Sequence, residues 1–95
     1  MSLLSVLVNG DAQLADERVY SEAIENAIEF AMLSLSEREA EVINRFFGLD
    51  REHETMAEIA EDLELKRERV RQIRNRAIRR LKKNYRKKLL EVRRS

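Results

Sequence analysis

The chain has 95 residues, of which 43% are hydrophobic and 39% charged, with two glycines and neither proline nor cysteine. This length corresponds to one small globular domain. Without cysteine the chain can form no disulfide framework and no thiolate metal site, and its single histidine, His53, leaves a zinc site without enough ligands. We therefore expect neither a metal ion nor another cofactor.

The longest apolar stretch runs from Leu3 to Val8 and is far shorter than the ~20 residues that span a bilayer. No basic residue precedes this stretch, and no cleavage site of small residues follows it at the right distance, so it does not resemble a signal peptide. These features predict a cytoplasmic protein without a membrane partner.

The formal net charge of +1 conceals a sharp division of charge between Leu65 and Lys66. Residues 1–65 carry 16 acidic and 4 basic side chains, a net charge of −12, whereas residues 66–95 carry 2 and 15, a net charge of +13. Such asymmetry indicates that the basic segment meets a polyanion and that the acidic part meets a different partner. A charged helix that is merely solvated is the alternative interpretation.

The first predicted helix follows residues 1–15, which we expect to be a flexible linker or a cloning remnant with a loose passage through Asn9, Gly10 and Asp11. Beyond them, apolar side chains recur every three or four residues, which predicts an amphipathic helix over roughly Asp16 to Leu33. The apolar residues of this pattern are Val19, Ala23, Ile24, Ala27, Ile28, Ala31 and Met32.

A second helix is predicted to begin after Ser36. Ser36 and Glu39 form an S-x-x-E capping box, in which the hydroxyl accepts from the third helical amide and the carboxylate accepts from the amide of the cap. Gly48 stands where a residue in the left-handed conformation would end this helix, and a polar loop, Asp50 to Glu54, follows. The helix is expected to bury Ala40, Val42, Ile43, Phe46 and Phe47.

A third helix of about two turns is predicted after Thr55, which forms a second capping box with Glu58. Its apolar positions are Met56, Ile59, Ala60 and Leu63, which share one face.

A fourth helix is predicted after the interruption at residues 64–66, because Val70, Ile73, Ala77 and Leu81 restore the helical spacing. Tyr85 and Leu89 continue the same stripe, so the helix is expected to run to about Val92. The predicted fold is therefore an all-α domain of four helices over residues 16–95. A short helix, a tight turn and a longer basic helix form the arrangement of a helix-turn-helix DNA reader.

The exposed face of the last helix carries the candidates for reading DNA. At about 100° per residue, Glu68, Gln72, Asn75 and Arg79 lie opposite the apolar stripe, with Arg67 and Arg71 beside them. Arg can donate two bonds to guanine, Gln can pair with adenine, and a carboxylate can accept from cytosine. Glu68 is interpreted as a base reader or as a group that orients a neighbouring Arg. A first-turn acid favoured by the helix dipole is the alternative.

Two stretches together resemble region four of the sigma-70 family of bacterial transcription initiation factors, and most closely its primary type. They are LSLSEREAEVINRFFGLD, residues 33–50, and TMAEIAEDLELKRERVRQIRNRAIRRLKK, residues 55–83. The resemblance covers about half the chain, and the run RERVRQIRNRA after EIAEDL is far more specific than a general helix-turn-helix pattern. The start of the chain is more loosely similar to the linker that precedes region four.

The resemblance implies that the last helix enters the major groove of the minus-thirty-five promoter element in double-stranded DNA. It assigns base reading to Arg67, Glu68 and Gln72, and to Arg71 a contact with the base edges or with the backbone of the DNA. Contacts to phosphates are expected from Lys66, Arg74, Asn75, Arg76, Arg79 and Lys82. Two positions depart from the family: Lys66 replaces the usual Ser or Thr cap, and Glu64 occupies a turn position often filled by Gly or Asp.

The resemblance also implies that the domain docks on the flap of the polymerase β subunit through an apolar surface. The candidates are Ile43, Phe46, Phe47 and Leu49. Two adjacent Phe residues on one helix cannot both point inward, so we expect one in the core and the other partly exposed. A purely structural role for these residues is the alternative.

Other functions remain open at this point. An anti-sigma factor or an activator are further possible partners, and the chain could instead be a stand-alone helix-turn-helix regulator. A basic helix lying on an anionic membrane is a third interpretation, which the few bulky apolar residues of 67–94 disfavour. Neither a catalytic triad nor a Gly-rich phosphate loop is present, so we expect no enzymatic activity. Full-length family members carry further promoter-binding domains, so the chain corresponds to one domain of a longer factor or to a naturally shorter protein.

Overall fold

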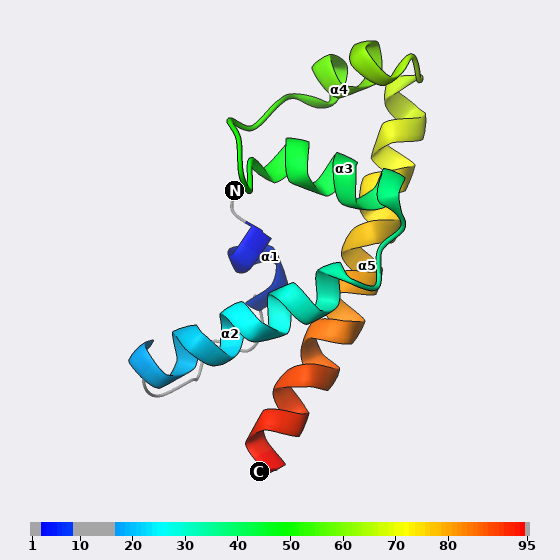
Figure 1. The fold of residues 1–95 in the computed structure, drawn as a ribbon. Coiled ribbons are helices and arrows are strands. Elements are labelled where there is room, and N and C mark those ends of the chain that lie inside the picture. The colour runs from blue at the N-terminus through cyan, green and yellow to red at the C-terminus, as the bar shows by residue number, and fades with distance from the viewer. Residues whose placement is uncertain (1–2, 9–16, 95) are drawn as a thin grey trace. The chain divides into compact units, whose positions relative to one another are not determined.

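The computed structural model describes residues 3–8 and 17–94, and every regular element within them is an α-helix. The elements in chain order are α1 (Leu3–Val8), α2 (Glu17–Met32), α3 (Glu37–Phe47), α4 (Met56–Leu63) and α5 (Arg67–Arg94) (Figure 1). The all-α prediction is confirmed, and the helices expected from the spacing of apolar residues form within a few residues of their predicted bounds.

The chain divides into two compact units. The N-terminal part through Ser34, with α1 and α2, joins the C-terminal part of α5 in the first unit. The second unit is Leu35–Arg79 and contains α3, α4 and the N-terminal part of α5. All the predicted site residues except Lys82 therefore belong to the second unit.

Helix α1 is a correction to the predicted four helices, because a loose start was expected there. Leu3 and Leu7 lie one helical turn apart, and both are buried. Six residues without a capping pattern give little signal in the sequence, and the burial of two leucines at that spacing stabilises the turn through packing. The predicted passage through residues 9–11 lies outside the described residues.

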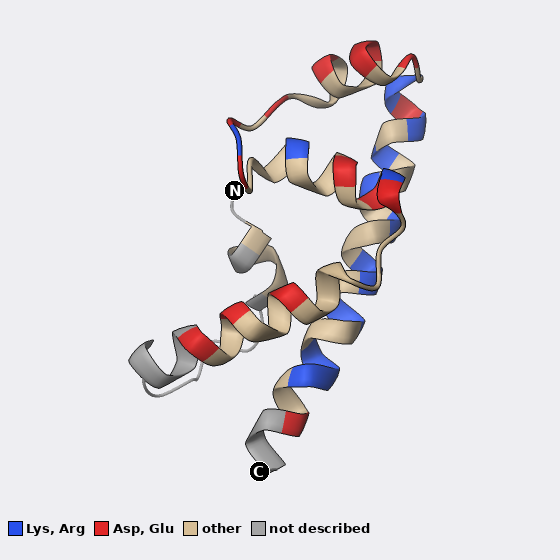
Figure 2. Ribbon diagram, viewed as in Figure 1, with Lys and Arg blue, Asp and Glu red and all other residues tan. Residues whose placement is uncertain are grey.

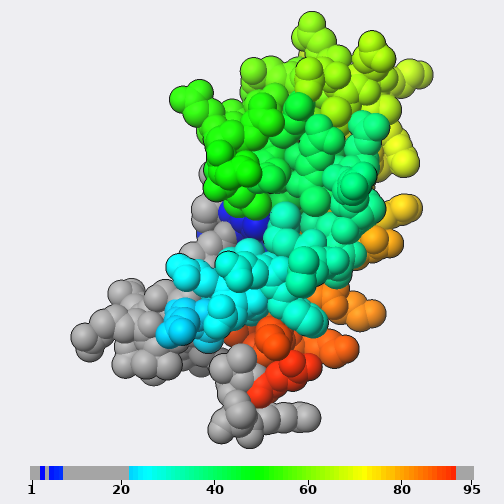
Figure 3. Space-filling model, viewed as in Figure 1, coloured from blue at the N-terminus to red at the C-terminus, as the bar shows by residue number. Residues whose placement is uncertain are grey.

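The second unit has a small apolar core that joins all three of its helices. Buried side chains come from each helix, and partly buried ones pack around them. In the space-filling view the side chains of α3 and α4 fill the space between the two helices (Figure 3). The buried residues are Val42, Ile59, Ala60, Val70 and Ile73, and the partly buried ones are Phe46, Met56, Leu63 and Leu65. This core holds the start of α5 against the two shorter helices.

Both predicted capping boxes form. The Ser36 amide donates to Glu39 over 3.0 Å, and the Glu39 amide donates to the Ser36 hydroxyl over 3.2 Å. The corresponding distances at the start of α4 are 3.0 and 3.1 Å for Thr55 and Glu58. Each box satisfies amides that would otherwise lack partners at a helix start, so the boundaries of α3 and α4 are fixed locally.

Gly48 ends α3 in the left-handed conformation, with φ of 63° and ψ of 51°. Its amide donates to the carbonyl of Asn44. A Cβ atom at this position would lie 2.7 Å from both the Arg51 carbonyl oxygen and the His53 amide nitrogen. Glycine is therefore required here for its backbone conformation and for the close approach of the following loop.

Among the described residues, no helix combines the length and the apolar character that crossing a membrane requires.

Candidate nucleic-acid interface

The turn between α4 and α5 is built around Glu64. This residue adopts the left-handed conformation, with φ of 56° and ψ of 42°, and is the one residue other than glycine with positive φ in the described part of the chain. The amide of Leu65 donates to the carbonyl of Ala60 over 2.9 Å, which closes the end of α4. The turn therefore has the conformation that a glycine would adopt with less strain.

Helix α5 begins at Arg67, directly after Lys66, whose carbonyl accepts from the Val70 amide over 3.1 Å. Helix α4 runs across the start of α5 rather than alongside it (Figure 1). Two helices joined by this tight turn form the predicted helix-turn-helix. The basic residues follow one another along α5, whereas the charged residues of α4 are acidic (Figure 2).

The four residues predicted to read bases share the exposed side of α5. Arg67, Glu68, Arg71 and Gln72 are all exposed, while Val70, between them in sequence, is fully buried. The buried face of the helix is therefore committed to the core of the second unit, and the polar face points away from that core. No side chain of this set has to leave a packed position to reach a ligand.

Glu68 and Arg71 are joined on this face. The Arg71 guanidinium donates to both carboxylate oxygens of Glu68, over 3.0 Å from Nε and 2.5 Å from a terminal nitrogen. This hydrogen bonding lowers the pKa of Glu68 below its ordinary value and raises that of Arg71. This geometry fits two of the interpretations open for Glu68: a group that orients Arg71, and an acid in the first turn of α5 that the helix dipole favours.

Arg74 and Asn75, both predicted to contact phosphates, are engaged within the second unit. The Arg74 guanidinium donates to Asn75 Oδ1 over 3.1 and 3.0 Å, and its central carbon lies 4.9 Å from the centroid of the Phe46 ring. This is a cation–π contact between α5 and α3. Position 74 borders the buried stripe of α5, so its long side chain packs across the interface between the helices.

The other candidates for phosphate contacts are exposed. Lys66, Arg76 and Arg79 are exposed in the second unit, and Lys82 is exposed on the part of α5 that belongs to the first unit. Their side chains are therefore accessible to a polyanion.

The sequence of this helix-turn-helix region matches a known protein family. The family described as "Sigma-70, region 4" matches residues 31–83, which include α3, α4, the turn and α5 as far as Lys83. The chain belongs to the sigma-70 family. Members of this family are DNA-binding regulators of transcription rather than enzymes.

Three relatives extend the similarity beyond region 4. The chain is 34% identical over 88 residues to the RNA polymerase sigma-C factor of Nostoc and 38% identical over 77 residues to the probable RNA polymerase sigma-C factor of Synechocystis. It is 36% identical over 83 residues to the chloroplastic RNA polymerase sigma factor sigD of Arabidopsis thaliana. These alignments cover 92, 80 and 86% of the chain but only 21, 19 and 20% of the relatives. The chain thus spans about a fifth of their length. No solved structure matches it.

The apolar residues predicted to contact the polymerase flap differ in exposure in this region 4 domain. Ile43 is fully buried and presents no surface. Phe46 and Phe47 are both partly buried, and their rings meet edge to face at 5.0 Å. Leu49 is 43% exposed. Of this set, only the residues at the end of α3 and just beyond it offer apolar surface.

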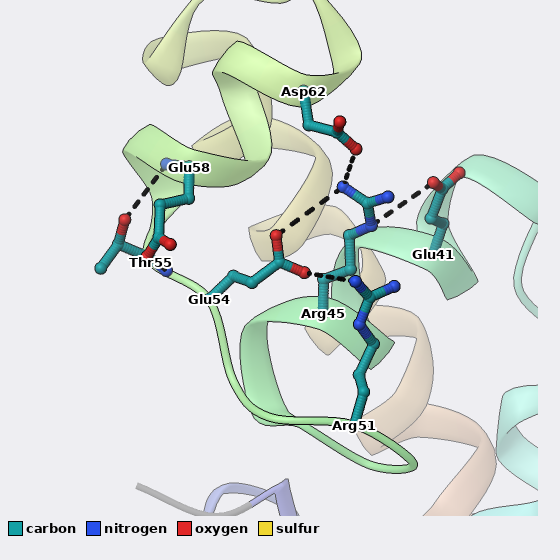
Figure 4. Close-up of polar contacts among 7 residues, drawn as sticks. All are labelled: Glu41, Arg45, Arg51, Glu54, Thr55, Glu58 and Asp62. Carbon is teal, nitrogen blue, oxygen red and sulfur yellow. Dashed lines mark hydrogen bonds and ion pairs between the residues drawn. The ribbon is translucent and has the colours of Figure 1, made fainter.

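Arg45 has a set of contacts that the sequence did not single out. Its guanidinium lies among three carboxylates from three segments of the region 4 fold (Figure 4). It lies 3.5 Å from Glu41 on α3 and 3.8 Å from Glu54 in the loop, and it donates a hydrogen bond to Asp62 on α4. The i to i+4 spacing predicts the pair with Glu41, but the other two depend on the tertiary fold.

Proposed function

We propose that the chain is the promoter-recognition domain of a sigma factor and that the start of α5 reads the minus-thirty-five promoter element. The observation that carries this proposal is the exposed polar face of Arg67, Glu68, Arg71 and Gln72, opposite the buried face of the same helix. The match to region 4 and the names of the relatives support it.

The chemistry of this face suits base edges in the major groove. Arg67 and Gln72 carry the groups that pair in a bidentate manner with guanine and adenine. Glu68 holds the Arg71 guanidinium in one plane through two hydrogen bonds. A prearranged guanidinium loses less side-chain entropy when it contacts a base than a free one does. The face therefore supplies directional donors and acceptors in addition to positive charge.

The charge distribution supports binding of a polyanion. The segment from Lys66 onward has a net charge of +13, and Lys66, Arg76 and Arg79 are exposed in the same unit as the reading face. Such side chains contact phosphates, fix the register of the protein on the duplex and release counterions on binding. In this proposal Arg74 and Asn75 support the interface from within the domain rather than contacting phosphates.

A titration of the chain with two labelled duplexes tests the proposal. One duplex contains the promoter hexamer and the other the same bases in scrambled order, and both are measured by fluorescence anisotropy at several matched salt concentrations. We expect weak binding to both, with tighter binding to the hexamer at every salt concentration, because one helix buries little area. Equal affinity for the two duplexes would contradict base reading.

A second function, docking on the flap of the RNA polymerase β subunit, is favoured by the apolar surface that follows α3. Leu49 is 43% exposed two residues after the partly buried Phe47, and an apolar contact site between proteins would need such residues to form a contiguous exposed patch. This surface belongs to α3 and its loop, whereas the DNA face belongs to α5, so the two functions are compatible.

Titration with a flap-tip peptide tests this second function. We expect Leu49→Ser to weaken binding of the peptide and to leave DNA affinity unchanged. If the chain binds the hexamer duplex but not the peptide, a stand-alone helix-turn-helix regulator is the better description. Competition by an anti-sigma factor or an activator for the same surface would indicate an additional partner.

A further inference from the structure

Arg45 contacts the loop that precedes α4 and the C-terminal end of α4 itself. On the N-terminal side, the Arg45 carbonyl accepts from the Glu54 amide over 2.8 Å, and its guanidinium faces the Glu54 carboxylate. Glu54 directly precedes Thr55, the cap of α4. On the C-terminal side, the guanidinium donates to Asp62, the second-last residue of α4 (Figure 4).

These contacts constrain the direction of α4 because they act near both of its ends. Helix α4 has eight residues and is about 12 Å long at 1.5 Å per residue. Ile59 and Ala60 of this helix are buried in the core, and Met56 and Leu63 pack against it partly buried. This apolar face sets the rotation of α4 about its own axis, but apolar burial is not directional and constrains the tilt of a two-turn helix less closely. The ion pairs of Arg45 near the two ends of α4 constrain the tilt of the helix relative to α3.

The Arg45 end of these ion pairs is largely shielded from solvent. The Arg45 side chain is 14% exposed, whereas that of Asp62 is 57% exposed. The hydrogen bond from Arg45 to Asp62 raises the pKa of the guanidinium further above its ordinary value, so the group stays charged. A guanidinium can donate to several carboxylates at once because its five N–H groups form a fixed planar fork. A lysine at this position would offer a single ammonium instead.

We propose that Arg45 is a positioning residue for DNA recognition, which sets the orientation of α4 against α3 and thereby the presentation of α5. This inference rests on the proposed function. Arg45 itself is on α3, and the inference gives it no contact with base or phosphate. Its effect passes through Asp62 into the end of α4, and from there through the Glu64 turn into the first residues of α5.

Two substitutions on α4 separate this role from a general effect of charge. Asp62→Asn removes the carboxylate that Arg45 contacts, while Glu61→Gln removes an equal charge at the neighbouring exposed position. Both variants lower negative charge near the DNA, which by itself favours binding of a polyanion. We expect Glu61→Gln to bind the hexamer duplex slightly more tightly than the parent chain and Asp62→Asn to bind at least about fivefold more weakly.

Arg45→Ala gives a second measurement, together with Arg51→Ala as a matched control. Arg51 pairs with Glu54 over 3.3 Å but has no ion pair to α4 in the described structure. Both measurements are made without denaturant, where circular dichroism shows that the variant is fully folded. We expect Arg45→Ala to speed amide hydrogen exchange in α4 and to weaken binding to the hexamer duplex. Arg51→Ala should leave both quantities close to those of the parent. Arg45→Lys should recover part of the lost affinity.

The outcomes distinguish this inference from the proposed function. If the parent chain binds hexamer and scrambled duplexes equally, the proposed function fails, and this inference with it. If the parent chain discriminates but Asp62→Asn and Glu61→Gln change affinity in the same direction and to the same extent, Arg45 has no positioning role. If Arg45→Ala does not fold, the Asp62→Asn and Glu61→Gln comparison decides alone.

Discussion

Glu68 and Arg71 lie one turn apart on the exposed face of α5, and both carboxylate oxygens of Glu68 accept hydrogen bonds from the Arg71 guanidinium. The pair places an acid among the side chains proposed to meet a phosphate backbone. An acid there weakens general attraction to DNA, and in our proposal this loss is offset by the direction that Glu68 gives to Arg71. Affinity and specificity should therefore respond to this acid in opposite ways.

Glu68→Gln should raise affinity for scrambled DNA and reduce discrimination between the hexamer and scrambled duplexes. The substitution removes one negative charge and loosens the hold on Arg71, which then contacts phosphates at any sequence. Anisotropy titrations with both duplexes at one salt concentration measure both effects. A parallel loss of affinity for both duplexes would show that Glu68 acts on folding or helix stability instead.

Arg67→Ala and Lys82→Ala should have different effects on DNA binding, the first on discrimination between sequences and the second on affinity for any sequence. Arg67 is proposed to read a base, so its loss should cost about 1 to 3 kcal/mol on the hexamer duplex and little on the scrambled one. Lys82 is proposed to contact phosphate, so its loss should weaken both duplexes alike and lower the salt slope by about one. Titrations across a salt series measure both quantities. Identical behaviour of the two variants would mean that the exposed face of α5 contributes charge alone.

Glu64→Gly should stabilise the domain by about 1 kcal/mol. Glu64 is in the left-handed conformation, which is strained for a residue with a Cβ atom and relaxed for glycine. Glu61→Gly is the matched control, because position 61 is helical and the same change there should destabilise by a similar amount. Urea unfolding followed by circular dichroism compares the two. Loss of stability in both variants would show that the side chain of Glu64 contributes more than its backbone strain costs.

Glu58→Gln should reduce the loss of stability in acid. The capping hydrogen bonds from Thr55 lower the pKa of Glu58 below its ordinary value of 4.5. A carboxylate with a lowered pKa in the folded state stabilises fully above its unfolded value, and this contribution disappears as the pH falls through the folded value. Glutamine keeps an oxygen for the Thr55 amide but does not titrate. Melting temperatures measured from about pH 6 to pH 3 should therefore fall less steeply in the variant, and equal slopes would contradict the assignment.

The helix boundaries of the second unit could be predicted because their determinants are local. The determinants are the two capping boxes, Ser36 with Glu39 and Thr55 with Glu58, and the left-handed Gly48 at the end of α3. Each involves residues close together in the sequence, and each is present in the structure as the sequence indicates. The exposed face of α5 was predictable for the same reason, since the apolar stripe of one helix defines its opposite side.

The contacts that could not be predicted are those between residues far apart in the chain. The cation–π contact between Arg74 and Phe46 and the ion pair between Arg45 and Asp62 depend on how the helices pack. The sequence alone does not show whether a basic side chain contacts a phosphate or an aromatic ring. The burial of Leu3 and Leu7 likewise depends on the packing of the first unit rather than on helix propensity.

Helix α5 has a consequence for how the chain can be dissected. The boundary between the two compact units, between Arg79 and Arg80, falls within this helix and not in a linker. A fragment that stops there would leave the last four carbonyls of the shortened helix without amide partners and would discard Leu81 and Tyr85, both fully buried. Truncation at this boundary would therefore cut through hydrogen-bonded backbone, and a gene fragment encoding the helix-turn-helix is best extended to include the whole of α5.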